Sequence, residues 1–364
     1  MKHSKRILEI DLDSIADNVV LLKKITGKKI LACVKCDGYG LGAIPVSKKI
    51  EKHIDWFGVA TVDEAVALRK SGIIKPVLVL GPAPASEAKK AIDYNISLAA
   101  ASMDFINKIQ SARNLSVHIK VDTGMGRIGI LPQHLNEAVR IIRKSKVKIE
   151  GIFSHFSNSE NPDRFFSLKQ IKIFSEALSV IPARSKIITH IANSGGIVNV
   201  PESVESFSMV RTGLLLYGVY PTLFLRVFKK ISGLRYALKG TAEILLVRDV
   251  PAGSAISYGG TYVCSKDTRI AIIGIGYGDG LDRSLSNRFF MKHNDKLFPV
   301  RGRICMDQTI LEIDQTLDEG SKIVFLDQEL SVEDMAQMCN TVPQEILTRF
   351  GVSRLKKVYL GKRN

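Results

Sequence analysis

The chain has 364 residues, 45% of them hydrophobic and 24% charged, a composition that excludes a chain too polar to bury a core. Its length predicts a large domain followed by a smaller one. Lys and Arg number 52 against 36 Asp and Glu, a net charge of +16, but the basic residues stand singly or in pairs and no nucleic-acid-binding module appears. We therefore expect a solvated surface, a site for small anions and no nucleic acid partner. The alternative, a nucleic-acid-binding module, predicts strongly salt-dependent affinity.

The cysteines and the apolar runs indicate the compartment. Five cysteines are an odd number, and no apolar segment separates the basic amino terminus from Glu9. The longest apolar stretch, residues 212–225, is short and contains Pro221, so we expect no membrane span. Cys33 and Cys36 have a C-x-x-C spacing, but three residues apart on one strand they would face opposite sides, so we expect neither a bridge nor a metal site. We expect a soluble, cytoplasmic protein.

From residue 7 onward the chain shows strand and helix patterns in regular order. Alternation predicts a strand over residues 7–12, and Asp13 or Ser14 can cap a helix that runs to about Lys24. Eight apolar runs then recur, each followed by a helical pattern or a turn able to hold one. They lie near residues 30–35, 55–60, 76–80, 97–100, 115–121, 147–154, 187–191 and 206–210. Eight such units predict a (β/α)8 TIM-type barrel, with the active site at the carboxyl ends of the strands.

Helix start signals support these units. Residues 61–64, Thr-Val-Asp-Glu, form a capping box, and Gly72 ends the helix that follows. Asn161 and Pro162 predict the start of a long helix that reaches about Val180.

After Pro221 the pattern changes to short β-type runs with turn signals. These runs lie at residues 242–247, 269–275, 298–304, 309–313 and 322–326, and helices are predicted over 332–338 and 344–350. We therefore expect a barrel domain over residues 1–230 and a mostly β domain over residues 231–364. The strand at 7–12 is a candidate to join the β domain.

Lys35 stands at the end of the apolar run 30–34 and is followed by Gly38, Gly40 and Gly42. A lysine at a buried strand end costs desolvation unless something uses it. The alternative is a side chain that extends from the strand end into water.

The run 116–122 places His118, Lys120 and Asp122 on one face and apolar residues on the other. In a barrel the apolar face packs on helices, so the polar face should point inward. The alternative to a functional role is a buried Lys120–Asp122 ion pair that only stabilises the barrel.

The last three strands also end in polar groups. His155 follows the sixth run, and the alternative for it is a core histidine bonded to backbone. The next two loops contain Asn193 and Ser194, and Arg211, Gly213 and Leu214, respectively. Glycines there let backbone N–H groups converge on an anion, and the barrel fold commonly binds phosphate at these loops.

Two stretches resemble the signatures of alanine racemases. Lys35, Gly38, Tyr39 and Gly42 fall in the order of the segment that carries pyridoxal phosphate (PLP), and Asp-Thr-Gly-Met-Gly-Arg-Ile-Gly at 122–129 matches the second signature at eight consecutive positions. Cys36, Gly38 and Leu41 depart from the commonest family residues.

The resemblance implies roles for residues of the barrel. Lys35 would carry PLP, Arg127 would contact the phenolic oxygen of PLP and the substrate carboxylate, and His155 would pack against the ring. Arg211 would face the pyridine nitrogen, and Lys120 occupies a position that is carbamylated in many members. The implied cofactor-binding residues are Lys35, Tyr39, Arg127, His155, Asn193, Ser194, Arg211, Gly213 and Leu214.

The same resemblance extends into the β domain. Residues 256–262, Ile-Ser-Tyr-Gly-Gly-Thr-Tyr, resemble the segment with the second catalytic residue, so Tyr258 would be an acid/base supplied by the partner subunit of a homodimer. Tyr277 would lie near the substrate entrance, and Met306 would meet the substrate carboxylate. Residues 274–280 look like a dinucleotide loop, but no suitable helical pattern follows. Ser353 stands where many members have a phosphate-contacting tyrosine.

The resemblance therefore implies an alanine racemase that interconverts L- and D-alanine through a PLP aldimine by a two-base mechanism, with D-alanine supplied for peptidoglycan. Lys35 and Tyr258 would be the two bases, in active sites at the interface of a homodimer. The alternatives are a racemase of broader specificity that also takes serine, a PLP decarboxylase of the same fold type, and a non-catalytic PLP-binding protein.

Overall fold

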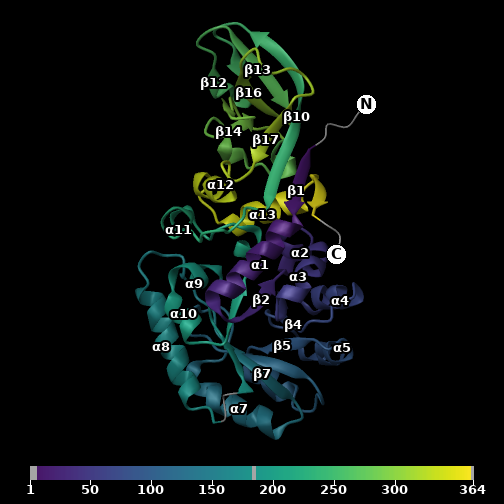
Figure 1. Cartoon of the computed structure of the whole chain (residues 1–364), viewed down its shortest axis with the longest axis vertical. Coiled ribbons are helices and arrows are strands. Elements are labelled where there is room, and N and C mark those ends of the chain that lie inside the picture. The colour runs from purple at the N-terminus through teal and green to yellow at the C-terminus, as the bar shows by residue number, and fades with distance from the viewer. Residues whose placement is uncertain (1–5, 183–185, 362–364) are drawn as a thin grey trace. The chain divides into compact units, whose positions relative to one another are not determined.

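A computed structural model describes residues 6–182 and 186–361 of the chain (Figure 1). The basic amino terminus considered above therefore lies partly outside the described residues, because residues 1–5 are not among them. The described residues form two compact units. The barrel unit contains Ile15–Gly38 and Gly42–Leu234, and the β unit contains the residues up to Ser14, Tyr39–Leu41 and the residues from Arg235 onward.

Eight parallel strands form the sheet of the barrel unit, in the order β8-β7-β6-β5-β4-β3-β2-β9. Backbone N–H groups of Ser208 and Arg211 donate to the carbonyls of Thr189 and Ala192 at 2.9 Å each, which joins β9 to β8 and closes the ring. The strands are β2 (Lys29–Cys33), β3 (Trp56–Val59), β4 (Val77–Val79), β5 (Ser97–Ala100), β6 (Ser116–Lys120), β7 (Lys148–Phe153), β8 (Ile188–His190) and β9 (Met209–Thr212). The predicted TIM-type barrel is confirmed.

Helices follow the strands along the chain. They are α1 (Leu12–Thr26), α3 (Ala43–Ile50), α4 (Val62–Lys70), α5 (Ala88–Asp93), α6 (Met103–Lys108), α7 (Leu135–Lys144), α8 (Phe165–Ser179), α9 (Ser194–Asn199), α10 (Pro201–Glu205) and α11 (Leu223–Phe228). Thr61 and Glu64 form the predicted capping box of α4. No helix among residues 6–182 and 186–361 is both long and apolar enough to cross a lipid bilayer.

Two helix starts differ from the prediction. The residue before α1 is Asp11, whose carboxylate accepts hydrogen bonds from the backbone N–H groups of Asp13 and Ser14, so Asp11 is the cap and the other two lie in the first turn. The helix predicted from Asn161 begins at Phe165 instead. Asn161 caps a local turn by accepting from the N–H of Asp163, and Asp163 in turn accepts from Phe165. In both places a neighbouring polar residue, Asp11 or Asp163, accepts the N–H group at the start of the helix.

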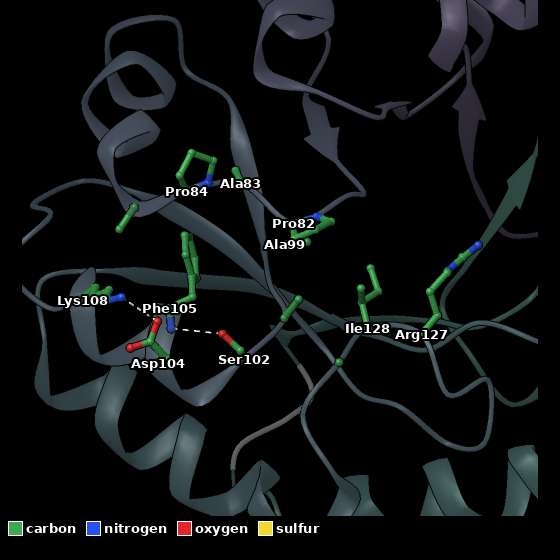
Figure 2. A pocket seen from close by; sticks show the side chains of 13 residues that line it. Pro82, Ala83, Pro84, Ala99, Ser102, Asp104, Phe105, Lys108, Arg127 and Ile128 are labelled. Atoms are coloured by element: carbon green, nitrogen blue, oxygen red, sulfur yellow. Dashed lines mark hydrogen bonds and ion pairs between the residues drawn. The ribbon is translucent and has the colours of Figure 1, made fainter.

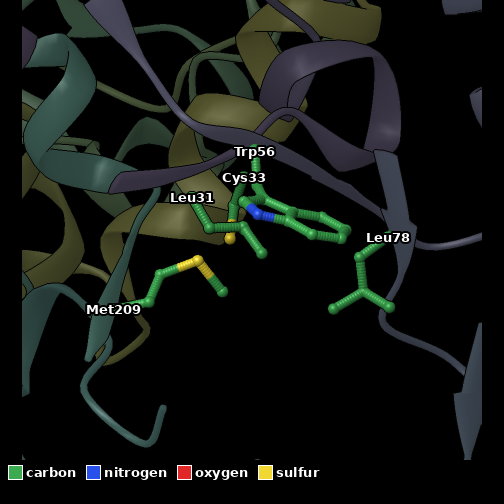
Figure 3. Packing of buried hydrophobic residues seen from close by; sticks show 5 residues of the cluster. All are labelled: Leu31, Cys33, Trp56, Leu78 and Met209. Carbon is green, nitrogen blue, oxygen red and sulfur yellow. The ribbon is translucent and has the colours of Figure 1, made fainter. Parts of the chain in front are cut away.

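The interior of the barrel contains an apolar cluster of side chains from four strands (Figure 3). Leu31 and Cys33 of β2 point the same way because they are two residues apart, and they meet Trp56, Leu78 and Met209 of the neighbouring strands. This cluster fills part of the barrel, and the polar residues described below occupy another part.

The β unit contains a mainly antiparallel sheet of eight strands built around β10 (Leu238–Val250), a 13-residue strand (Figure 1). The other strands of this unit are β1 (Ile7–Asp11), β11 (Ala255–Ile256), β12 (Tyr262–Val263), β13 (Thr268–Ile273), β14 (Phe290–His293), β15 (Lys296–Pro299), β16 (Thr309–Ile313), β17 (Lys322–Leu326) and β18 (Lys356–Leu360). β1 pairs with β10 and β18, so the first strand of the chain belongs to this sheet. The unit also contains α12 (Val332–Met338) and α13 (Pro343–Val352).

Candidate active site

Lys35 follows β2 directly and begins a short turn of left-handed helical backbone. Cys36, Asp37 and Gly38 have φ values of 54°, 51° and 64°, and the side chain of Lys35 is exposed. Non-glycine residues rarely adopt this conformation, so Cys36 and Asp37 need support from their surroundings. Cys36 lies on this turn and Cys33 ends the strand, so the expectation that both lie on one strand was wrong.

Hydrogen bonds with the side chains of Glu64, Asp37 and Tyr217 stabilise the turn. Glu64 of α4 accepts from the N–H of Cys36 at 2.6 Å through one oxygen and from the N–H of Ala60 at 2.7 Å through the other. The carboxylate of Asp37 accepts from the N–H of Ala43, and the buried hydroxyl of Tyr217 donates to the carbonyl of Gly38, both at 2.8 Å. The capping box identified Glu64 only as a helix cap, and no sequence signal pointed to Tyr217.

Arg211 of β9 is buried, and two of its nitrogens make four hydrogen bonds to two histidines and two backbone carbonyls. Its Nη1 donates to Nδ1 of His190 at 2.8 Å, and its Nη2 donates to Nδ1 of His155 at 2.9 Å. Nη2 also lies 2.8 Å from the carbonyl oxygen of Ser154 and 2.9 Å from that of Ile191. Burial lowers the pKa of Arg211 to about 10, so it remains a cation at neutral pH and its plane is fixed.

Arg211 also determines the tautomers of two buried histidines. Arginine can only donate, so Nδ1 of His190 accepts. Burial, and next the charge of Arg211, hold the pKa of His190 well below its usual range, so its single proton lies on Nε2 and is donated to Nδ1 of His118 at 3.0 Å. Burial lowers the pKa of His118 to about 4, which leaves its proton on Nε2, an atom without a hydrogen-bond partner among the described residues.

Lys120 of β6 points into the barrel, with its Nζ 4.9 Å from the centre of the Phe153 ring. The alternative ion pair with Asp122 is absent from the described structure, because Asp122 accepts the N–H groups of Gly124, Met125 and Gly126 instead. Nζ has no hydrogen-bond or ion-pair partner in the described ranges. Burial, and next the charge of Arg211, hold the pKa of Lys120 well below its usual value, which favours a neutral amine.

His155 connects the cationic residues of the barrel unit. Its Nδ1 is bonded to Arg211 rather than to backbone, so the alternative of a backbone-bonded core histidine does not describe this ring. Burial is the largest cause of its strongly lowered pKa, followed by the charges of Arg211, Lys120, Arg127 and Lys35. Basic side chains therefore surround one neutral ring, and no carboxylate is among these causes, so the surroundings suit an anionic ligand.

The loops after β8 and β9 come together through Ser194, whose Oγ accepts from the N–H of Gly213 at 3.2 Å. Asn193 accepts from the N–H of Gly196 at 2.8 Å and from the hydroxyl of Ser159 at 2.7 Å. The hydroxyl of Thr212 is buried and has no partner in the described part of the chain. Hydroxyls and a glycine backbone at this position fit the phosphate of a cofactor such as PLP, and the cations around His155 fit its remaining negative charge.

A pocket of about 500 Å³ lies beside Arg127, between that residue and the loops after β4 and β5 (Figure 2). Proline and alanine side chains form one wall, and Lys108, which is paired with Asp104 at 2.8 Å, lies at the end away from Arg127. The guanidinium of Arg127 is exposed and makes no hydrogen bond with any described residue, so it is available to an anion.

Three candidate residues of the β unit are exposed on neighbouring turns. The exposed fractions are 70% for Tyr258, 54% for Met306 and 44% for Tyr277. The carbonyls of Cys305 and Met306 accept from the N–H groups of Tyr277 and Gly278 at 3.0 and 2.9 Å. Large exposed apolar and aromatic side chains on hydrogen-bonded turns are typical of a surface that another molecule covers.

Ser353 is occupied within its own turn. Its hydroxyl donates to the carbonyl of Phe350 at 2.7 Å and accepts from the N–H of Leu355 at 3.3 Å. The next residue, Arg354, is paired with Asp279 and with Asp307. Ser353 therefore has little hydrogen-bonding capacity left for a phosphate.

The structure thus joins Arg211 to His155 and Ser194 to Gly213 by hydrogen bonds, and it places Lys120 and Arg211 beside the same Phe153 ring. Lys35 and Arg127 act on His155 through their charge. Tyr258, Tyr277 and Met306 lie in the β unit, as does Tyr39. His190, which no sequence motif indicates, is bonded to both Arg211 and His118.

Comparison with known proteins agrees with this architecture. Residues 10–221 match the family model described as alanine racemase, N-terminal domain, and residues 237–359 match the model for alanine racemase, C-terminal domain. Alanine racemase 2 of Caldanaerobacter subterraneus subsp. tengcongensis is 35% identical, covering 97% of this chain and 94% of the relative.

Solved structures give the same result. The crystal structure of alanine racemase from Streptomyces lavendulae has a TM-score of 0.91 and 32% identity, covering 100% of this chain and 99% of that one. The enzyme from Bartonella henselae, solved with covalently bound pyridoxal phosphate, has a TM-score of 0.87 and 27% identity, covering 98% and 99%. The chain therefore belongs to the alanine racemase family.

Proposed function

We propose that the protein is a PLP-dependent alanine racemase that interconverts L- and D-alanine by a two-base mechanism. The observation that carries the proposal is the group around Arg211, in which a buried arginine holds two neutral histidines beside three further basic side chains. This arrangement suits an anionic, nitrogen-containing aromatic cofactor. Membership of the family supports alanine as the substrate.

Named residues would hold the cofactor in the barrel unit. Lys35 would bind it covalently, and Ser194, Asn193, Gly213 and Leu214 would surround its phosphate end. Tyr39, which the resemblance also makes a cofactor-binding residue, would contact it as well. Arg211 would face the pyridine nitrogen, His155 would pack against the ring, and Arg127 would contact the phenolic oxygen. When bound, PLP supplies an electron sink for the bonds at the substrate Cα. Arg211 does not readily release a proton, so the ring nitrogen of the cofactor would stay unprotonated. The ring would then withdraw electrons less strongly, which would suppress side reactions such as transamination.

Two side chains would move the proton. Racemisation requires an acid/base on each face of Cα, and Lys35 and Tyr258 are the proposed pair. Tyr258 would come from the partner subunit of a homodimer, together with Met306 at the substrate carboxylate and Tyr277 near the entrance. The exposure of all three side chains supports a role across an interface. We propose a cytoplasmic enzyme that supplies D-alanine for peptidoglycan.

The alternatives differ in what they require of the β unit. A non-catalytic PLP-binding barrel lacks such a unit, and here residues 237–359 match the racemase C-terminal domain. A PLP decarboxylase of this fold type would need a different phosphate loop and a catalytic cysteine in the β unit. A racemase that also accepts serine would need the same β unit, because serine differs from alanine by only one hydroxyl.

A product assay separates these activities. The purified protein is first loaded with PLP. It is then incubated in separate reactions with L-alanine, L-serine or L-lysine, and the enantiomers and any carbon dioxide are measured. D-alanine should be the main product. The variant Lys35→Ala should lose both the reaction and the absorbance band of covalently held cofactor, whereas Lys29→Ala, an exposed lysine at the start of the same strand, should retain them. A Lys35→Ala protein that keeps the band would end the assignment.

A further inference from the structure

Ser257, which precedes Tyr258, has a backbone conformation that serine rarely adopts. Its φ is 61° and its ψ is −171°, a combination that is essentially restricted to glycine. All the other described non-glycine residues with positive φ outside the turn after Lys35 are asparagines, which tolerate left-handed turns. A glycine would meet the backbone requirement at position 257 without cost, so the serine side chain must contribute something that a glycine cannot.

The hydroxyl of Ser257 connects its turn to residues 303–306. Oγ donates to the carbonyl of Arg303 at 2.6 Å and lies 3.4 Å from the thiol sulfur of Cys305. A hydroxyl has one proton, so with that proton donated to Arg303 its oxygen can only accept from the thiol of Cys305, which also lies 3.6 Å from the Arg303 carbonyl.

The backbone on both sides of Tyr258 is pressed against this same segment. A Cβ on Gly302 would lie 2.5 Å from the carbonyl oxygen of Ile256 and 2.8 Å from the Cβ of Ser257. On the other side, a Cβ on Gly259 would lie 2.8 Å from Nη1 of Arg303. Tyr258 is therefore flanked by two close contacts, and the Ser257 hydroxyl supplies the hydrogen bond between them.

The segment that accepts this hydrogen bond also bears Met306. Its carbonyls at Cys305 and Met306 hold the turn of Tyr277, as described above. We propose that Ser257 is a positioning residue that fixes the direction of the Tyr258 phenol and couples it to the segment that carries Met306. The inference rests on the proposed function, in which Tyr258 handles the proton and Met306 contacts the substrate.

The test compares Ser257→Ala, which loses the hydroxyl, with Ser257→Gly, which loses the hydroxyl but accepts the backbone conformation. The matched control is Thr268→Ala in the same unit, which removes a hydroxyl bonded to the carbonyl of Lys266 at 2.7 Å. We expect both Ser257 variants to lose roughly tenfold to hundredfold in kcat with little change in KM, because a displaced acid/base slows proton transfer without weakening binding. The control should keep the kcat of the unmodified enzyme.

Isotope effects separate positioning from general damage. Racemisation of alanine deuterated at Cα is measured from each enantiomer. In the Ser257 variants the isotope effect should rise only for the enantiomer whose proton Tyr258 removes, because the Lys35 side is unchanged. Equal changes for both enantiomers, or a Ser257→Gly enzyme as fast as the original, would overturn the inference.

A second readout does not depend on activity. Fluorine NMR of protein carrying fluorotyrosine shows one signal per tyrosine environment, and Tyr258→Phe identifies the signal of Tyr258. That signal should shift or broaden in both Ser257 variants and not in Thr268→Ala. An unmoved signal contradicts the positioning role even if the protein proves not to racemise alanine, whereas a moved signal in a protein without racemase activity refutes only the proposed function.

Discussion

Gly151 of β7 and His118 of β6 are so close that a Cβ on Gly151 would lie 2.2 Å from Nδ1 of the imidazole. Because position 151 has no side chain, the His118 ring can occupy the place in which its Nδ1 accepts a hydrogen bond from Nε2 of His190. Gly151 therefore helps to fix the position of Arg211, because His118 holds His190 and His190 accepts a hydrogen bond from Arg211.

Gly151→Ala should displace His118 and destabilise the protein by about 1–3 kcal/mol, the usual cost of overpacking a core. Urea unfolding measures the stability, and nitrogen NMR of the imidazoles measures the tautomers. Gly27→Ala is the comparison, because no atom lies near its Cβ position and only its backbone, at a φ of 62°, is strained. It should leave the His118 and His190 signals unchanged. An intact pair of signals in Gly151→Ala would contradict the role given to Gly151.

Acid should destabilise the protein through its buried neutral histidines. The pKa of His118 is lowered from 6.5 to about 4, so between these values the unfolded state binds a proton that the folded state does not. Stability is therefore fully retained above pH 6.5 and declines as the pH falls toward 4, by about 1.4 kcal/mol per pH unit for each such group. His118→Asn should make the decline less steep by up to that amount. Thermal unfolding at several pH values measures the slope, and an exposed histidine, replaced in His134→Asn, serves as the control. Equal slopes for both variants would contradict the burial argument.

Lys120 should react with carbon dioxide. A neutral amine is required: its nitrogen forms a bond to the carbon of CO2 and releases a proton, giving a carbamate, and burial favours the neutral form. The carbamate is an anion, and the basic side chains around it offset the desolvation cost of burying its charge. Native mass spectrometry should show the mass of one added CO2, and labelled bicarbonate should give a carbamate carbon signal that is absent from Lys120→Ala. Lys148→Ala, which removes an exposed lysine paired with Glu150, should keep the signal. An unmodified Lys120 in bicarbonate buffer would refute this prediction.

Ser194→Ala should weaken cofactor binding. The hydroxyl lies between the two loops proposed to hold phosphate, and loss of one such hydrogen bond to a charged group costs about 1.5–3 kcal/mol, which is at least roughly tenfold in Kd. Titration of the cofactor-free protein with PLP measures Kd. Ser203→Ala provides the control, because Ser203 is buried and its hydroxyl donates to the carbonyl of Val200 at 2.7 Å, with that of Gly196 at 3.5 Å, and is not among the residues proposed to hold the phosphate. A similar loss of affinity in both variants would indicate a general effect on the fold.

Much of the fold was predictable because it depends on local patterns. The apolar runs of the barrel correspond to β2 through β9, and the predicted helix at 332–338 matches α12. The capping box at Thr61 and Glu64 forms as expected. Errors arose where several polar residues adjoin a helix start, as at Asp11 and at Asn161, because spacing does not reveal which side chain reaches the free N–H groups.

The site was less predictable, because its connections join residues far apart in the chain. The sequence indicated Arg211 and His155 separately, but His190, which orients Arg211, sits in a short apolar run without a motif. The left-handed turn after Lys35 depends on Glu64 and Tyr217, which only the tertiary structure brings to it. The assigned roles of Lys35 and Tyr258 remain predictions.

The orphan N–H of His118 determines how protons can travel. Every hydrogen bond in the row from Arg211 to His118 points the same way, and the row stops at an atom with no acceptor in the described part of the barrel. A chain of hydrogen bonds that ends without an acceptor cannot relay protons, so hydrogen exchanged between solvent and a substrate cannot pass along it through the interior. Exchange must use groups at the open end of the barrel.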